Sequence, residues 1–234
     1  MARVTANSQQ PPRTPRDDFG SKVLAHQRYY TADGTQVPGV TTILGVLDKP
    51  YLVAWANRMG LQGIDSRKYT DEAASVGTLA HYLVECELAG VEPILDDYTP
   101  NQLERAQHSL GHFHAWKAQH DLSPVLVEAQ LVSERYRYGG TVDCVAWLDG
   151  QLTLIDNKTS SGIYDEMKWQ VAAYMALAVE HGHRCTGARI LRIPRSDGDG
   201  LIEHVLSRQE LVVGWTIFHH ALSIYGLKKK LRQR

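Results

Sequence analysis

The stretch that decides the fold runs from Gly140 to Lys158 and reads GTVDCVAWL-DG-QLTLIDNK. Asp-Gly between two β-rich runs predicts a two-residue turn and therefore an antiparallel hairpin. Counting outward from that turn places Asp143 opposite Asp156 as a non-hydrogen-bonded pair, with Cα atoms about 4.5 Å apart. Lys158 leaves the same strand face as Asp156, because side chains repeat every second residue.

Two carboxylates that face each other across a strand pair repel, and the fold must offset this repulsion. At a surface-like dielectric they repel by about 3 kcal/mol. A fold removes this repulsion by protonating one acid or by placing a cation between them. A divalent metal with oxygen ligands fits the second solution. The hairpin therefore predicts a divalent-cation site, with the Lys158 ammonium pointing into the same place.

The composition describes an ordinary globular protein. The chain has 234 residues, of which 43% are hydrophobic and 22% charged, and its net charge of −1 gives no global field toward nucleic acid. No apolar run approaches the roughly 18 residues of a membrane span. The three cysteines form no CxxC pair, which argues against a zinc or iron–sulfur site and for reduced thiols in a cytosol. We expect a cytoplasmic protein of a bacterium or phage-infected cell rather than a mitochondrial one, and no membrane contact.

Hydrophobic periodicity predicts one domain of class α/β. Residues 1–22 are polar and proline-rich, which predicts a disordered tail. Residues 23–234 are predicted as a single domain, with a helical N-terminal part over 38–120, a catalytic α/β core over 71–206 and a closing helix over 208–232. The core order is helix, three strands, helix, strand (αβββαβ). The crossover helix sets the last strand parallel to one of the first three, in a mixed sheet.

Histidines on two predicted helices are candidate metal ligands. His81 lies on the helix before the strands and is either an ordinary helical residue or a third ligand beside the two carboxylates. Glu85 follows four residues later on the same face and could be a further ligand, but we expect a solvated acid. His108 and His112 form an i, i+4 pair as an alternative zinc site, but no acidic third ligand or catalytic glutamate sits beside them.

The segment after Lys158 offers groups for nucleic acid. Gln170 and Tyr174 share one helix face; both can donate hydrogen bonds, and a tyrosine can stack on a base. The alternative is an amphipathic helix with Tyr174 at the edge of the core. Thr159 and Ser160 either contact phosphate or cap a helix.

Together these residues resemble the PD-(D/E)XK nuclease superfamily, in the branch of RecB-type nuclease domains, CRISPR-adaptation nucleases and the mitochondrial genome maintenance exonuclease. The resemblance covers most of residues 37–195 and implies a restriction-endonuclease-like core. The matching segments, in order, are Val37–Leu44, Gly77–His81, Gly140–Asp143, Ile155–Thr159 and Gln170–Tyr174.

The resemblance implies a role for each matching residue. Mg²⁺ or Mn²⁺ is held by His81, Asp143, Asp156 and the backbone carbonyl of Asn157. Lys158 positions or activates the attacking water and stabilises the charged phosphorane. Gln170 and Tyr174 hold the DNA strand, and Glu128 is a further active-site acid.

The expected function is therefore metal-dependent hydrolysis of DNA, by an exonuclease acting on single-stranded ends in replication, recombination or repair. A structure-specific endonuclease for flaps or junctions, and a non-catalytic DNA-binding recombination module, are the alternatives. Val142 replaces the proline that names the family, and the four-cysteine cluster of some relatives is missing. The helicase portion of RecB-type enzymes is absent too, so we expect the nuclease to act alone or to recruit a recombination or replication protein.

Overall fold

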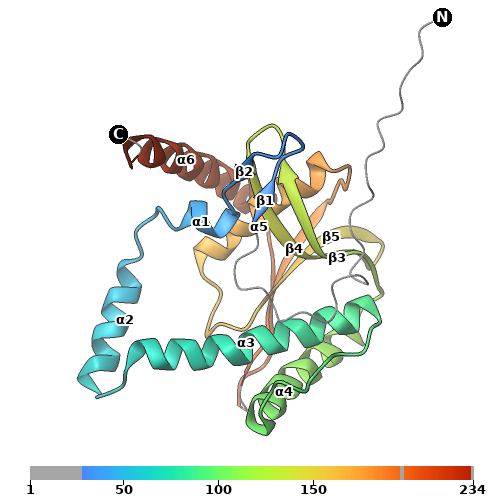
Figure 1. Cartoon of the computed structure of the whole chain (residues 1–234). Helices are drawn as coiled ribbons and strands as arrows, with labels where there is room; N and C mark the ends of the chain where they lie inside the picture. The colour runs from blue at the N-terminus through green and yellow to red at the C-terminus, as the bar shows by residue number, and fades with distance from the viewer. Residues whose placement is uncertain (1–27, 196–197, 233–234) are drawn as a thin grey trace, which may run out of the picture.

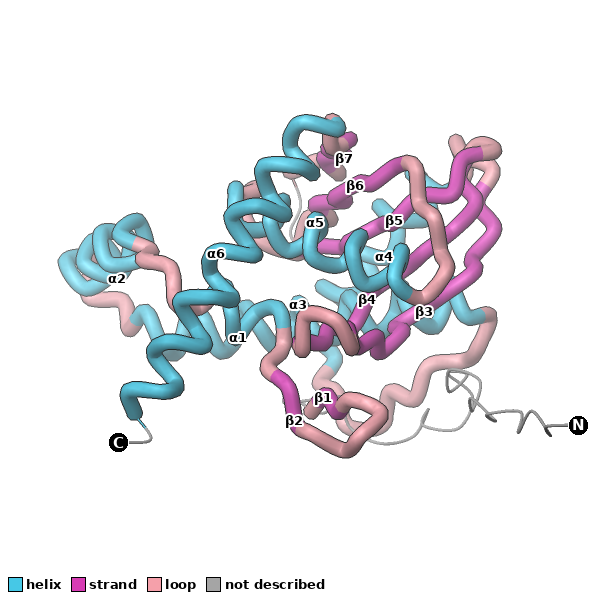
Figure 2. Tube along the Cα trace, turned by 90° about the horizontal axis from the view of Figure 1, so that it is seen from above, coloured by secondary structure: helices cyan, strands magenta, loops and turns pink. Residues whose placement is uncertain are grey.

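The protein is built on one five-stranded mixed sheet. This computed structural model describes residues 28–195 and 198–232 (Figure 1). The strand order is β3-β4-β5-β6-β7 (Figure 2). The strands are β3 (Leu122–Ser133), β4 (Tyr138–Leu148), β5 (Gln151–Lys158), β6 (Gly187–Arg192) and β7 (Ile202–Val205). β5 and β6 are parallel and joined through helix α5 (Asp165–Glu180), whereas the other neighbours are antiparallel. The predicted mixed sheet and crossover helix are confirmed.

The β4–β5 turn sets the register of the hairpin. Asp149 and Gly150 have φ angles of +50° and +79°, as a two-residue turn matched to the twist of the strands requires. The ladder then runs from Leu148 opposite Gln151 to Cys144 opposite Ile155. This is the register predicted from the sequence.

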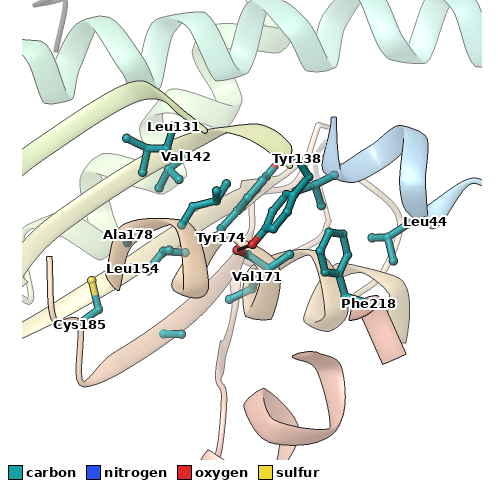
Figure 3. Packing of buried hydrophobic residues seen from close by; sticks show 14 of the residues in the cluster. Leu44, Leu131, Tyr138, Val142, Leu154, Val171, Tyr174, Ala178, Cys185 and Phe218 are labelled. Carbon is teal, nitrogen blue, oxygen red and sulfur yellow. Dashed lines mark hydrogen bonds between the residues drawn. The ribbon is translucent and has the colours of Figure 1, made fainter. Parts of the chain in front are cut away.

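Helices cover both faces of the sheet. One face packs against α5 and α6 (Arg208–Arg232), and the other against α3 (Ser66–Ala89) and α4 (Pro100–Lys117). Successive side chains of a strand point to opposite faces, so each strand contributes to both cores. Leu154, for example, faces the α5 side and Ile155 faces the α3 side. Figure 3 shows the α5-side core, where Tyr138 and Phe218 pack with ring centroids 4.8 Å apart.

The N-terminal elements lie beside this sandwich. A small hairpin of β1 (Tyr29–Tyr30) and β2 (Gln36–Val37) leads into α1 (Val40–Leu44) and α2 (Pro50–Leu61). Helix α2 buries no residue and stands apart from the strands (Figure 2). Lys49, which directly precedes α2, forms an ion pair with Glu166 of α5, and Trp55 in the middle of α2 contacts the ring of Tyr69 on α3.

The structure tests the prediction for the cysteines but not the prediction for the N-terminal tail. The predicted tail, residues 1–22, lies outside the described residues. The three cysteines are described, and all are buried and unpaired. None of the helices within residues 28–195 and 198–232 combines the length and apolar character that a membrane crossing needs.

Candidate active site

The two predicted carboxylates lie where the β4–β5 ladder ends. A continuing ladder would direct the backbone N–H of Asn157 at the carbonyl of Val142. Instead this N–H donates to Asp143 Oδ2 over 2.8 Å, so the ladder stops at Cys144 and Ile155, one step before the two acids. The register was predicted correctly, but the Asp143–Asp156 step is not part of the ladder, because a carboxylate takes the place of a backbone acceptor.

Asp156 is the most buried member of the site. Its side chain is 1% exposed, and Lys158 Nζ lies 2.6 Å from Oδ2. The ammonium thus occupies Oδ2, whereas Oδ1 has no hydrogen-bond donor among the described residues. Burial raises the pKa of Asp156 to about 6; the nearby Asp143 charge adds to this effect and the Lys158 charge opposes it. Oδ1 is therefore a buried oxygen that a ligand outside the chain would satisfy.

Lys158 supplies positive charge to this cluster. Burial alone lowers the pKa of its ammonium, but the carboxylates of Asp156 and Asp143 outweigh burial and raise the pKa above its ordinary value. Lys158 is therefore held protonated. In this environment it acts through its charge rather than by accepting a proton.

His81 reaches the cluster from α3. Its Nδ1 lies 3.8 Å from Asp143 Oδ2. Burial and the nearby Lys158 charge lower the pKa of His81 to about 4, so the imidazole is neutral at physiological pH, the form that binds metals. Gly77, one turn earlier, allows this approach, because a Cβ there would lie 2.6 Å from Thr159 Oγ1.

Two further acids join the same cluster. Glu128 on β3 has a left-handed φ of +46°, an uncommon conformation for a residue other than glycine and one that concentrates at functional sites. Burial and the charges of Asp143 and Glu85 raise its pKa well above the ordinary value. Glu85 is half-buried, and burial with the Asp143 charge raises its pKa to about 7. The expectation that Glu85 is a solvated acid was wrong; its i, i+4 spacing from His81 was the available signal.

The α5 residues form a support beneath β4. Tyr174 is 6% exposed, and its hydroxyl accepts a hydrogen bond from Gln170 Nε2 over 2.8 Å. A Cβ at Gly140 would lie 2.6 Å from the Tyr174 ring, so only glycine admits the ring here. The faces of the Tyr174 ring are therefore covered.

Thr159 and Ser160 lie in the loop that leaves β5. The Thr159 side chain packs against Gly77, and the Ser160 hydroxyl donates to the carbonyl of Gly162 over 2.7 Å. The buried Arg192 fixes this loop, because its Nε donates to the Ser160 carbonyl over 3.0 Å. Sequence reasoning missed Arg192, since nothing in a strand pattern shows which loop a distant guanidinium will hold.

Tyr29 is a second residue that the sequence did not single out. Its hydroxyl lies 3.0 Å from Thr141 Oγ1, and a Cβ at Gly139 would lie 2.4 Å from its ring. The β1–β2 hairpin thereby packs directly on the strand segment that carries Asp143. No local pattern links these positions, which are more than a hundred residues apart.

The chemistry of this cluster suits a hard divalent cation, although no cage is preformed. Within residues 28–195 and 198–232, no three His, Cys, Asp or Glu side chains are arranged closely enough to hold a metal as they stand. Yet the Asp156 carboxylate with its unpartnered Oδ1, the Asp143 carboxylate and a neutral His81 are donor types that such an ion takes, with water completing the shell. The alternative pair, His108 and His112, brings its Nε2 atoms within 3.2 Å but adds no third ligand among the described side chains.

Comparison with known proteins identifies the family. The profile of the PD-(D/E)XK nuclease superfamily matches residues 54–223, which is most of the chain. The chain belongs to this superfamily. The resemblance inferred from the sequence is confirmed, and the five-stranded mixed sheet flanked by helices is consistent with the family's fold.

The individual proteins similar to this chain include proteins named as exonucleases. The chain is 27% identical over 212 residues to mitochondrial genome maintenance exonuclease 1 of Mus musculus, covering 83% of this chain and 60% of that protein. The chain thus spans less than two thirds of this relative. The alkaline exonuclease LHK-Exo of Laribacter hongkongensis is 15% identical with a TM-score of 0.33, over 69% of this chain and 91% of that one. Its complex with dAMP gives 12% identity and a TM-score of 0.35, over 67% and 85%.

The raised pKa of Glu85 predicts a pH-dependent stability. Its pKa is about 7 in the folded protein against an ordinary value of 4.5, so the folded state binds the extra proton between these values. Its contribution to stability is complete below pH 4.5 and is lost as the pH rises through 7. In metal-free buffer, the free energy of unfolding of wild type should therefore fall by about 1 kcal/mol more than that of Glu85→Gln when the pH rises from 5 to 8. This figure allows for screening by solvent.

Urea unfolding at both pH values measures this difference. The matched control is Glu104→Gln, which removes an exposed acid of α4. Equal losses of stability in the two variants would contradict the burial of Glu85 in the acidic cluster.

Proposed function

We propose that this protein is a metal-dependent DNA nuclease that hydrolyses phosphodiester bonds, acting as an exonuclease on single-stranded ends. The observation that carries the proposal is the Asp143, Asp156 and Lys158 set. Two desolvated carboxylates, one of which has a buried oxygen without a hydrogen-bond donor, lie beside a protonated lysine. As a purely structural feature this set would be destabilising, because buried like charges repel and buried charges lose hydration.

Mg²⁺ or Mn²⁺ fits the donor set best. Asp143, Asp156, the neutral imidazole of His81 and the backbone carbonyl of Asn157 are the groups that would hold it. When bound, such an ion lowers the pKa of water and neutralises charge on the phosphate. Its binding would also relieve the repulsion that raises the pKa of Asp156 and of Glu128.

The side chains of this protein contribute positioning and charge. Lys158 places a fixed ammonium beside the site where negative charge develops on the phosphorane, and its raised pKa keeps that charge in place. The Asn157 N–H holds Asp143 through a 2.8 Å hydrogen bond, which fixes one carboxylate oxygen. Glu128 and Glu85 add acids that keep the site attractive to cations.

A preference for strand ends is supported by the resemblance to mitochondrial genome maintenance exonuclease 1, because an exonuclease acts at the end of a strand.

Substitution of the central groups should abolish cleavage. Asp156→Asn keeps the shape of the side chain and removes its charge, and Lys158→Met keeps the stem and removes the ammonium. Each should lower kcat for a labelled single-stranded oligonucleotide in Mg²⁺ by about 10³-fold, as for loss of a principal electrostatic group. Circular dichroism should show an unchanged fold, and Asp96→Asn, an exposed acid, should leave kcat unchanged.

Near-normal cleavage by either central variant would remove these residues from the active site. Binding of DNA by the wild type without any metal-dependent cleavage would indicate a non-catalytic module instead.

Substrate topology tests the preference for ends. Linear single-stranded DNA should be degraded at least about tenfold faster than a closed circle of the same sequence, because a circle offers no strand end at which an exonuclease can start. Duplex DNA with flush ends should be cut more slowly than the linear single strand. Gel analysis of end-labelled and internally labelled substrates distinguishes these outcomes. Equal rates on circles and linear strands would favour an endonuclease.

A further inference from the structure

Helices α5 and α6 enclose a groove on the side of α5 turned away from the acidic cluster. They cross at Gly214, where a Cβ would lie 3.0 Å from Ala172 Cβ and 3.2 Å from the carbonyl of Lys168. Beside this close crossing the helices separate and leave a hollow of about 600 Å³. Its lining is largely apolar and includes Met175, Val179, Leu211, Val212, Trp215 and Tyr136.

The groove and the candidate active site use opposite faces of one helix. Ala172, Met175 and Val179 line the groove, whereas Gln170 and Tyr174 face β4 and the site. At 100° per residue these two sets point in nearly opposite directions. An occupant of the groove would therefore leave the acidic cluster open.

Apolar side chains at the rim are left uncovered. Val179 is 50% exposed and Val212 59% exposed, and both border the hollow that Trp215 and Tyr136 also line. Isolated exposed valines are common, but exposed valines around an apolar groove with aromatic side chains are typical of a binding site. A hollow of this volume lies within the range of ligand sites. It has room for two or three apolar side chains of a partner.

Arginines supply the charge of the rim. Arg135 and Arg208 both line the groove, and neither forms an ion pair with a described residue. The nearby Glu180 is already engaged, because it accepts from the Ser133 hydroxyl over 2.6 Å and from the Glu134 N–H over 2.9 Å. Arg208 is also the first residue of α6, where the positive end of the helix dipole disfavours a cation unless an anion approaches.

We propose that the α5–α6 groove is a docking site for a short acidic segment of a partner protein, in which apolar side chains alternate with carboxylates. The apolar side chains fill the hollow over Met175 and Trp215, and the carboxylates pair with Arg135 and Arg208. This occupant matches both the apolar floor and the cationic rim. A nucleic acid strand would satisfy the arginines but would bring no aliphatic side chains to the floor. The inference does not depend on the nuclease activity.

Fluorescence anisotropy with a labelled ten-residue peptide that alternates aspartate with leucine and phenylalanine tests this proposal. The full-length protein should bind it saturably below 1 mM. A peptide with lysine in place of aspartate, and one with alanine in place of the apolar residues, should bind at least tenfold more weakly.

Matched variants locate the binding. The double variant Arg135→Glu, Arg208→Glu should bind the acidic peptide at least tenfold more weakly than wild type. Val212→Asp should bind it at least fivefold more weakly. The controls lie outside the groove. Arg184→Glu reverses the charge of an exposed arginine, and Val205→Asp changes a valine that is 59% exposed, as Val212 is. Both controls should bind the peptide with an affinity within twofold of wild type. Cleavage of DNA by all four should stay within twofold, so the docking site and the active site fail or succeed separately.

Three results would overturn the proposal. The first is the absence of saturable binding up to 1 mM. The second is equal binding by the groove variants and their controls. The third concerns the double variant: its affinity for a single-stranded oligonucleotide falls more than its affinity for the peptide. That result would assign the groove to nucleic acid.

Discussion

Mutual repulsion among buried carboxylates at the open end of the β4–β5 hairpin is the constraint on which the rest of this structure depends. Asp143 and Asp156 lie with Glu128 and Glu85 around a single lysine, and burial raises the pKa of each of the four acids. Lys158 offsets part of this repulsion, and the raised pKa values favour protonation of some of the acids when no cation is bound. The proposed divalent ion would supply the further positive charge that lets these acids ionise.

The surrounding fold holds the acids together against this repulsion. Glycines allow three close approaches: Gly77 lets α3 reach Thr159, Gly139 admits the Tyr29 ring and Gly140 admits Tyr174. The large core beneath α5 and α6 fixes the strands from one side, and α3 with α4 fixes them from the other. The proposed metal site would need this rigidity, because its ligands must stay within a fraction of an ångström of their positions.

The sequence predicted what local chemistry determines. Asp149–Gly150 specified the turn, the turn specified the register, and the register brought Asp143 and Asp156 to one end of the hairpin. The crossover helix and the parallel β5–β6 pair followed from chain order and handedness. His81 was predicted from its place before the strands and reached the cluster as expected.

Long-range contacts escaped prediction. Tyr29 and Thr141 meet across 112 positions, and Arg192 fixes the loop after Lys158 from a neighbouring strand. Neither pairing leaves a periodic signal, because each depends on how separate elements pack. Glu85 was misjudged for a related reason: its exposure is decided by the sheet that α3 covers, not by its own helix. The left-handed backbone of Glu128 was likewise invisible in its strand pattern.

The central claim is that these carboxylates are forced together to hold one divalent cation, and calorimetric titration of Mn²⁺ into the metal-free protein tests it most directly. The account predicts saturable binding to wild type that is lost in Asp143→Asn and in Asp156→Asn. It also predicts that a hundredfold excess of Mn²⁺ over its Kd raises the free energy of unfolding of wild type by about 2.7 kcal/mol. Equal binding by wild type and both variants, or none to wild type at millimolar Mn²⁺, would contradict it.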